Sequence, residues 1–523
     1  MAVQAPENDT GPSSPRPPST VLPRAPFPVG GAGEPPTAGP GVPPHPGRPH
    51  RPLLFRRPSA LALVALAYLA AQLALVVPHL AHLLGWDETV YVSQVNARIP
   101  AAYFSAPRSR GISFLVAPLL TVTDSPHALR LYLAVLAALA LYAAYRTWRP
   151  LLGPAVTTVA ALLFASLWTT QLYGPQAMPN LWVALAAVAA LGWFLRAPTE
   201  PYARWWCAAC LVVVALMRIS DVAWLALPLL LTAVFVRRHR RTLPFLLGGL
   251  AAGVAQWVVE AYARWGGIPQ RLHASAATEG GMSPHLNFHN AWRSLDGPEL
   301  CRWSCTAQQH HPALGVWWLS LPVFAAVALV IAVRDKGVGR ERVVLPLAAA
   351  GALAVPYLLL ISYSAPRFLM PAYALLALPI AGLVVRATAG RRWLVAVVSV
   401  LVALHVASQF VVVQKVTAEA VRTDRLYRTA ARDLRDLGIH GGGCLITGSH
   451  ALPVAYDAGC ASAETDGNNA STTASRVVAR AENRQPVVAL SSRAEPRPGY
   501  ARTWTRFHLR GTHWAAWVAP RGE

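Results

Sequence analysis

Two adjacent acidic residues follow shortly after the first long apolar segment of the sequence. Asp87 and Glu88 belong to the segment Gly85–Tyr91, which follows that run. Adjacent acids at an apolar boundary are costly unless they are solvated or used in chemistry. They predict either a solvated helix N-terminus, where acids complement the helix dipole, or a carboxylate base at the level of the lipid headgroups. Periodicity alone leaves both interpretations open.

Two further acids have an arginine at helical spacing. Asp221 lies three residues after Arg218, and Glu260 lies four residues before Arg264. Side chains at these spacings are neighbours on a helix, so each pair predicts an ion pair. For Glu260, a place in the lining of a cavity remains an alternative.

The composition restricts the elements that can position these groups. Hydrophobic residues make up 54% of the 523 residues, charged residues make up 13%, and the mean hydropathy is +0.36. Soluble domains carry about 25% charged residues, so the chain is predicted to be a polytopic membrane protein. The formal net charge of +22 does not indicate nucleic-acid binding. The arginines lie in the N-terminal tail, at the ends of apolar segments and in the C-terminal region, without a basic stripe.

Apolar segments recur along the chain at lengths that suit a helix crossing about 30 Å of hydrocarbon. We expect an all-α bundle of about 11 transmembrane helices, followed by a small α/β region. The predicted spans are residues 59–79, 127–145, 152–172, 178–195, 205–217, 221–236, 243–263, 312–333, 343–362, 368–386 and 393–413. The fifth and sixth are short, and Met217–Asp221 is either a helical hairpin tip or a kink.

The positive charges fall in alternate loops. With a cytoplasmic N-terminus, every inner loop is basic and the short outer loops are nearly free of lysine and arginine, as the positive-inside rule requires. The inner-loop residues are Arg146, Arg149, Arg196, Arg204, Arg237, Arg238, Arg240, Arg241, Arg334, Lys336, Arg340, Arg342, Arg386, Arg391 and Arg392. An odd number of spans in the plasma membrane then places the C-terminus on the extracytoplasmic side.

The chain divides into three predicted parts. They are a Pro-rich disordered cytoplasmic tail (1–57), a transmembrane part (58–413) with large outer loops at 80–126 and 264–311, and an extracytoplasmic C-terminal region (414–523). The tail cannot bury enough apolar surface to offset the entropy of ordering it. In the C-terminal region, Gly443–Thr447 and Val487–Leu490 predict strands.

Four of the six cysteines fall in the predicted outer regions as two pairs. The pairs are Cys301 with Cys305 and Cys444 with Cys460. Paired cysteines on the oxidising side of a membrane predict disulfides. Free thiols remain an alternative for each pair, and so does a metal site in which loop histidines join the cysteines.

Several short motifs occur in one order and on one predicted side. They are Asp87-Glu88-x-x-Tyr91, Pro107-Arg108-Ser109-Arg110-Gly111, Ala128-Leu129-Arg130-Leu131 and Ser364-Ala365-Pro366-Arg367-Phe368-Leu369-Met370-Pro371. Together they resemble the C-type glycosyltransferases (the GT-C superfamily), most closely the protein-mannosyltransferase and aminoarabinose-transferase kind. The resemblance covers roughly residues 59–390.

The resemblance implies roles for individual residues. Asp87 is implied as the general base, and Glu88 as its partner or substitute. A guanidinium group matches phosphate oxygens bidentately, which suits the phosphate of the donor. The implied donor-phosphate ligands are Arg367, with Arg108 and Arg130 in support, and the implied substrate contacts are Tyr91 and Tyr363.

The resemblance also implies the substrates. The donor is a sugar carried on a polyprenyl phosphate, and the acceptor is a glycan, lipid or protein that the sequence does not name. Relatives often carry an acid before the fourth span, where this chain has Gln176-Ala177-Met178-Pro179-Asn180. That departure puts a metal site built on the acid in doubt, and a divalent metal is kept only as an alternative.

The predicted function is therefore transfer of a glycosyl unit, a hexose or a pentose, at the outer face of the plasma membrane. The first alternative is a transporter or lipid-carrier flippase, which should show internal repeats and polar groups at mid-membrane. The sequence has no such repeat, and its polar groups gather at one face. A non-catalytic scaffold that displays the C-terminal region is the other alternative.

Overall fold

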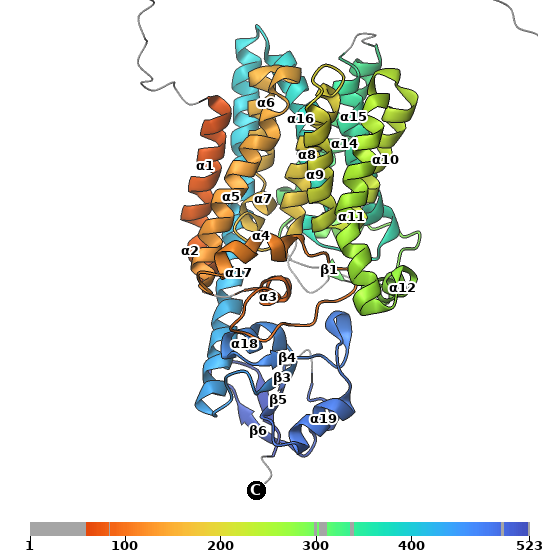
Figure 1. Ribbon diagram of the computed structural model, residues 1–523. Coiled ribbons are helices and arrows are strands. Elements are labelled where there is room, and N and C mark those ends of the chain that lie inside the picture. The colour runs from red at the N-terminus through yellow and green to blue at the C-terminus, as the bar shows by residue number, and fades with distance from the viewer. Residues whose placement is uncertain are drawn as a thin grey trace, which may run out of the picture. The chain divides into compact units, whose positions relative to one another are not determined.

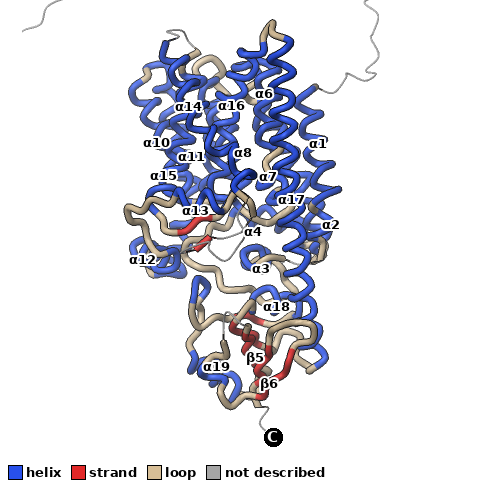
Figure 2. Tube along the Cα trace, turned by 180° about the vertical axis from the view of Figure 1, so that it is seen from behind, coloured by secondary structure: helices blue, strands red, loops and turns tan. Residues whose placement is uncertain are grey.

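The computed structural model describes residues 59–82, 84–297, 301–302, 311–334, 339–492 and 496–520. Residues Pro58–Glu523 form one compact unit, which Figures 1 and 2 show from opposite sides. The predicted N-terminal tail, residues 1–57, lies outside the described residues.

Seven helical segments of the described chain are long and apolar enough to cross a membrane. They are α5 (Pro126–Arg146), α8 (Pro179–Arg196), η1 with α11 (Arg237–Thr242 and Leu243–Trp265), η2 with α14 (Pro312–Gly315 and Val316–Arg334), α15 with η3 (Glu341–Val355 and Pro356–Leu360), η4 with α16 (Pro366–Leu369 and Met370–Thr388) and α17 (Arg392–Asp436). The predicted multi-pass, mainly helical architecture is confirmed.

Four other predicted spans coincide with shorter apolar helices. They are α1 (Ala60–Leu75), α6 (Arg149–Ala165), α9 (Ala203–Met217) and α10 (Ile219–Phe235). Arg218 separates α9 from α10 because its backbone is extended, with φ −151° and ψ 111°. Within α6, Gly153 has a φ of +79° and precedes Pro154, which kinks that helix. The count of eleven spans stays a prediction.

Burial separates the central helices of the bundle from the peripheral ones. In α8 and α16, 72% of the most apolar 18-residue stretch is buried inside the protein. In α14 and α17, only 11% of the corresponding stretch is buried. α8 packs against α5, α9 and α16, and α16 packs against α6 and α15. The unburied apolar faces of α14 and α17 suit contact with lipid.

Short elements gather at the end of the bundle where α5, α8 and α16 begin, which we call the loop end (Figure 1). They are α2 (Val77–Leu80), α3 (Trp86–Ser93), α4 (Gly111–Leu120), α7 (Trp168–Tyr173), α12 (Ile268–Glu279), α13 (Phe288–Arg293) and an antiparallel pair of β1 (Cys301–Arg302) and β2 (Tyr363–Ser364).

The helix α17 continues from the bundle into the C-terminal region (Figure 2). It has 45 residues and is therefore about 68 Å long, more than twice the hydrocarbon thickness of about 30 Å. Its last turns bury Tyr427, Ala431 and Leu434 in the core of the C-terminal region. Residue 413, the predicted boundary, lies inside this helix.

The C-terminal region is built on a five-stranded sheet. The strand order is β4 (Ala461–Ser462), β3 (Leu445–Gly448), β5 (Val487–Ser491), β7 (Ala515–Val518) and β6 (Thr505–His508). The first three strands are parallel and the last two are antiparallel to their neighbours. The helices α18 (Ala451–Ala458) and α19 (Ala474–Glu482) follow β3 and β4 in the chain. β3 and β5 are the two strands predicted from the sequence.

The C-terminal region also contacts the loop end. α18 packs against α3, and Asn96 Nδ2 donates a hydrogen bond to the hydroxyl of Tyr456 at 3.0 Å. The sheet is thus attached to the bundle by a covalent helix and by a second, non-covalent contact next to α3.

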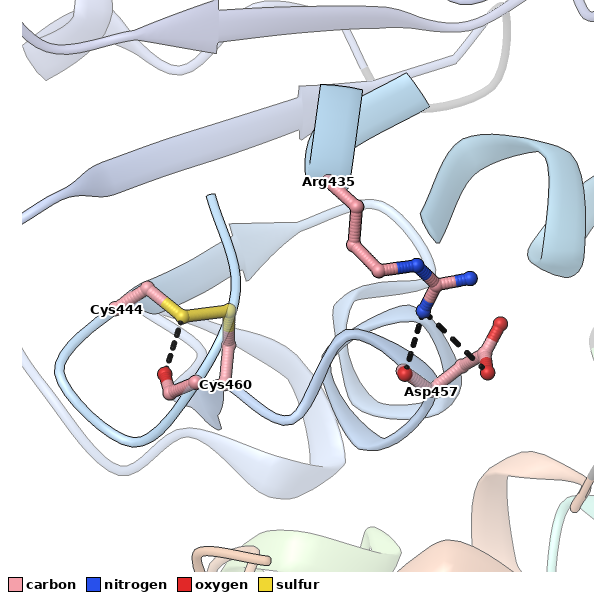
Figure 3. The surroundings of a disulfide bond; sticks show 5 residues. Arg435, Cys444, Asp457 and Cys460 are labelled. Atoms are coloured by element: carbon pink, nitrogen blue, oxygen red, sulfur yellow. Dashed lines mark hydrogen bonds and ion pairs between the residues drawn. A yellow bond between two sulfur atoms is a disulfide. The ribbon is translucent and has the colours of Figure 1, made fainter. Parts of the chain in front are cut away.

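A disulfide joins Cys444 to Cys460 with a Cα–Cα distance of 5.0 Å (Figure 3). The two cysteines immediately precede the parallel strands β3 and β4, so the bond fixes the start of one strand to the start of the next. Near the disulfide, Arg435 of α17 donates to the carbonyl oxygen of Asp457 at 2.8 Å. The other predicted disulfide, Cys301–Cys305, involves Cys305, which lies outside the described residues.

Candidate active site

The acids Asp87 and Glu88 open helix α3. Glu88 Oε2 accepts the backbone N–H of Gly85 at 3.0 Å, which caps the first turn. The expectation of a helix N-terminus is therefore correct, but the two acids are not simply solvated. The Glu88 side chain is 5% exposed and the Asp87 side chain is 30% exposed.

Both oxygens of Asp87 are held by arginines. Arg108 Nη2 donates to Oδ1 at 2.8 Å, and Arg367 Nη2 donates to Oδ2 at 3.0 Å. The side chains of Arg108 and Arg367 are 14% and 12% exposed. The structure thus brings together three of the residues named from the sequence, which come from α3, from the loop before α4 and from η4.

Opposing effects act on the pKa of Asp87. Burial raises it, while the positive charges of Arg108, Arg367 and Arg218 lower it, and the result is a pKa of about 2. The Asp87 carboxylate is therefore ionised throughout the physiological pH range.

Glu88 and Arg130 form a separate, buried ion pair. Arg130 is 1% exposed and donates to both carboxylate oxygens of Glu88. It also donates to the carbonyl oxygens of Leu80 and Pro175, each at 3.0 Å. Glu88 accepts a further bond from the backbone N–H of Ala177 at 2.7 Å. The pair ties α3, α5 and the segment before α8 together.

A buried arginine, Arg271, holds the loop that carries Arg108 through hydrogen bonds to the loop backbone. Arg271 of α12 donates to the carbonyl oxygens of Ala106 at 3.1 Å and of Arg108 at 2.9 Å. It is 0% exposed and also pairs with Glu260 at 3.3 Å. Burial lowers the pKa of Arg271, and Glu260 opposes that shift. These contacts hold Arg108 in place before any ligand arrives.

Glu260 is the centre of a three-arginine cluster. The predicted pair with Arg264 is confirmed at 3.0 Å, and Arg110 approaches Glu260 more closely, at 2.6 Å. Gly111 lets this loop approach α9, since a Cβ there would lie 2.5 Å from the carbonyl oxygen of Leu216.

Two arginines at the loop end contact the same aromatic ring, that of Phe368. The guanidinium carbons of Arg367 and Arg218 each lie 5.5 Å from the ring centre of Phe368. Tyr357 of η3 stacks on the same ring at 4.9 Å, and its hydroxyl donates to Asp221. The predicted Arg218–Asp221 ion pair is confirmed at 3.2 Å.

Arg218 and Tyr357 were not predicted as site residues. Arg218 was explained by its ion pair, but its charge also acts on Asp87. The only sequence signal was the break between two apolar segments at this arginine. Tyr357 stands in no motif, and its π-helical turn is visible only in the structure. Such turns are rare and are frequent at functional sites.

Of the two tyrosines implied as substrate contacts, Tyr91 lies beside Arg108 and Tyr363 lies beside Phe368. Tyr91 is 6% exposed, with the Arg108 guanidinium 5.3 Å from its ring centre. Tyr363 of β2 contacts Phe368 edge-on at 5.7 Å, and its carbonyl oxygen accepts from Asn287 at 2.7 Å.

The described residues hold no group of three His, Cys, Asp or Glu side chains that could bind a metal ion. The one carboxylate at the centre of the site, Asp87, has both oxygens bound to guanidinium groups. At the position where relatives often carry an acid, Gln176 and Asn180 are buried. This donor set does not suit a divalent cation, which prefers several carboxylate oxygens.

Comparison with known proteins gives a fold but no sequence family. No family model matches the chain, and no curated protein matches it. Among solved structures, it is similar to ArnT from Cupriavidus metallidurans, both bound to undecaprenyl phosphate and in the apo state. In each case the TM-score is 0.61 and the identity 13%, over 88% of this chain and 97% of that chain. It is also similar to an oligosaccharyltransferase from Archaeoglobus fulgidus, with a TM-score of 0.49 and 13% identity over 83% of this chain and 69% of that one. The chain thus has the fold of ArnT, which is the C-type glycosyltransferase fold that the sequence motifs predicted.

Proposed function

We propose that the protein is an integral membrane glycosyltransferase that moves a sugar, a hexose or a pentose, from a polyprenyl-phosphate donor to an acceptor hydroxyl. The observation that carries this proposal is a single carboxylate, Asp87, held between Arg108 and Arg367. An anion-binding pair of arginines beside a proton acceptor is what such a transfer requires. The ArnT fold supports a polyprenyl-phosphate donor, because ArnT was solved with undecaprenyl phosphate.

The donor phosphate competes with Asp87 for the two arginines. Guanidinium groups bind phosphate oxygens strongly and bidentately. When the phosphate takes over Arg108 and Arg367, Asp87 loses the contacts that lower its pKa, and its basicity rises. Donor binding thereby prepares the base in the same step that places the leaving group.

In the reaction, the acceptor oxygen forms a bond to the anomeric carbon of the sugar. The bond between that carbon and the phosphate oxygen breaks, and polyprenyl phosphate leaves with the electron pair. Asp87 takes the proton of the acceptor hydroxyl. Arg367 and Arg108 stabilise the charge that develops on the phosphate. Attack from the face opposite the phosphate inverts the anomeric centre.

Two groups named from the sequence take a different role in this proposal. Glu88 and Arg130 are buried and satisfied by each other and by backbone groups. We assign them to positioning α3, and so Asp87, rather than to contact with the donor.

The proposed location of the reaction is the outer face of the plasma membrane. The helices that begin at the loop end carry Arg146, Arg196 and Arg386 in their last turns. Basic residues at that end favour a cytoplasmic location for it. The Cys444–Cys460 disulfide belongs on the oxidising side. Reporter fusions after Val413 should be active only outside the cytoplasm, and the opposite result would reverse the orientation.

The decisive experiment is donor turnover by the purified protein in detergent. Polyprenyl-phosphate sugars are supplied with a set of envelope acceptors, and release of polyprenyl phosphate is followed by mass spectrometry. Release that depends on an acceptor supports the proposal. The competing function, lipid-carrier flipping, predicts transbilayer movement of the donor in liposomes with no cleavage of the sugar–phosphate bond, and that result would replace the proposal.

A further inference from the structure

A groove of about 610 Å³ lies between the loop after α3 and the C-terminal sheet. Its lining comes from residues 94 and 101–103 and Arg264 on one side, and from β4, residues 471–472 and α19 on the other. Three arginines line it, namely Arg264, Arg476 and Arg480, and no aspartate or glutamate does. Arg264 is paired with Glu260 at 3.0 Å, so the positive charge that the groove offers to a ligand comes from Arg476 and Arg480, outside the cluster around Asp87.

One face of α19 is turned to this groove. Arg476, Ala479, Arg480 and Asn483 line it and are exposed. Their spacing of three, four and seven residues places them on one side of a helix. Val477 is buried against the sheet. The two arginine side chains carry no hydrogen bond or ion pair within the described part of the chain.

The remaining lining suits a hydroxyl-rich ligand. Hydroxyl groups come from Ser462, Ser471, Thr472 and Tyr103, and an amide group comes from Asn483. A peptide is a poor fit, because the edge strand β4 offers only two residues for strand pairing. A nucleic acid is also a poor fit, because Tyr103 is the one aromatic side chain in the lining and base stacking needs several.

The groove opens next to the proposed reaction centre. Asp87 is in the first turn of α3 and Gln94 is its C-cap, so the two backbones are about 10 Å apart along the helix. Gln94 Oε1 accepts from Arg110 at 2.8 Å, and Arg110 in turn binds Glu260. The groove lining therefore includes the end of the helix whose first turn carries Asp87.

We infer that this groove binds the acceptor, and that the acceptor is an anionic oligosaccharide whose carboxylate or phosphate groups pair with Arg476 and Arg480. The identification as acceptor rests on the proposed function. The C-terminal region then has a defined task, which is to hold the distal sugars while the terminal hydroxyl approaches Asp87.

The test is binding of two size-matched probes to the full-length protein in detergent, measured by isothermal titration calorimetry without donor. Trigalacturonate is the anionic probe and maltotriose is the neutral one. Wild-type protein should prefer trigalacturonate, and the double variant R476E/R480E should weaken its binding by about tenfold or more, since two charge pairs become repulsions. Equal binding of both probes by the wild type would overturn the inference.

A charge-matched variant controls for long-range electrostatics. Arg432 and Arg502 are exposed residues of the C-terminal region outside the groove lining. R432E/R502E changes the net charge equally and should keep trigalacturonate binding within about twofold at physiological salt, where distant charges are screened. Equal losses in both double variants would overturn the inference.

Two further binding measurements distinguish an oligosaccharide site from a lipid site, and this inference from the proposed function. Dihexanoyl phosphatidylglycerol is the probe for a lipid headgroup, and a larger loss of its binding than of trigalacturonate binding in R476E/R480E would assign the groove to lipid instead. The Asp87→Asn variant should bind trigalacturonate like the wild type. If the groove variants bind trigalacturonate normally while the wild type transfers sugar, only this inference fails; if the wild type shows no acceptor-dependent release of polyprenyl phosphate, the proposed function fails.

Discussion

Arg367 and Asp87 are 280 positions apart in the sequence, and Arg367 Nη2 donates to Asp87 Oδ2 at 3.0 Å. Arg367 comes from η4 and Asp87 from α3, so the contact joins the start of a central helix to a loop helix. The residue proposed to bind the donor phosphate, Arg367, is thus hydrogen-bonded to the proposed base, Asp87.

Asp87→Asn should lower turnover by about 10²–10⁴-fold, the usual contribution of a positioned base. The amide keeps the shape of the carboxylate but cannot take the proton. Binding of polyprenyl phosphate should persist, because the two arginines remain and lose their competing anion. Mass-spectrometric turnover and donor binding are measured together. Asp124→Asn is the control, since Asp124 is 47% exposed in the same loop. Turnover of Asp87→Asn near the wild-type rate would refute the base assignment.

Arg367→Ala should weaken both donor binding and turnover, because the contact to phosphate is made in the ground state and in the transition state. We expect a loss of about tenfold to a hundredfold in binding, the range of a charge-assisted hydrogen bond. Arg367→Lys should recover part of it, since charge remains but the planar fork is lost. Arg98→Ala, at a side chain 64% exposed, is the matched control. Unchanged polyprenyl-phosphate affinity in Arg367→Ala would contradict the proposal.

The pH dependence should differ between kcat/KM and kcat. The pKa of free Asp87 is lowered to about 2, so kcat/KM, which reports the free enzyme, should show no acid limb from this group at pH 5–8, a window several units above that pKa. In the donor complex the arginines move to the phosphate and the pKa of Asp87 rises. The acid limb of kcat should therefore lie at higher pH than that of kcat/KM. Profiles with the two limbs in the opposite order would argue against the exchange of partners.

The lowered pKa of Asp87 also predicts how the stability of the folded protein depends on pH. The carboxyl of Asp87 has a lower pKa in the folded protein than in the unfolded chain, so its stabilising contribution is complete above the unfolded value of about 3.9. It is lost as the pH falls toward the folded value of about 2. Stability near neutral pH should not change through this group.

Glu88→Gln should destabilise the fold rather than remove the base. Arg130 is 1% exposed and would lose its carboxylate partner; breaking a buried pair in this way costs about 3–5 kcal/mol. Thermal unfolding in detergent should show a larger drop in Tm for Glu88→Gln than for Asp87→Asn, because the side chain of Asp87 is 30% exposed and that of Glu88 is 5% exposed. The double variant Glu88→Met/Arg130→Met should recover part of the loss, since no charge is left unpaired. An unchanged Tm with lost turnover in Glu88→Gln would point to catalysis instead.

Cys444→Ser should destabilise the C-terminal region. The disulfide closes a loop over a sequence separation of 16, worth about 3 kcal/mol in the chain-entropy model. Mass mapping under non-reducing conditions should find the two cysteines joined. A reducing agent should lower the Tm of the wild type more than that of the variant. Two free thiols in the purified protein would remove the prediction.

The sequence by itself determined the apolar helices, and it also pointed to Asp87, Arg108 and Arg367. A long apolar run has one stable solution in a bilayer, because every backbone polar group must be satisfied within the helix. The motifs lie next to the ends of such runs, so their residues gather at one end of the bundle. Local patterns were also enough for the Arg218–Asp221 and Glu260–Arg264 pairs, which lie within one helical turn.

Only the tertiary structure decided which of these groups meet. Asp87 and Glu88 are neighbours in the chain, yet successive residues on a helix point in different directions, and one carboxylate received two partly exposed arginines while the other was buried with Arg130. Arg218, Tyr357 and the groove beside α19 depend on contacts between segments far apart in sequence. No local pattern encodes such contacts, because packing among the helices of the bundle and of α18 on α3 fixes them.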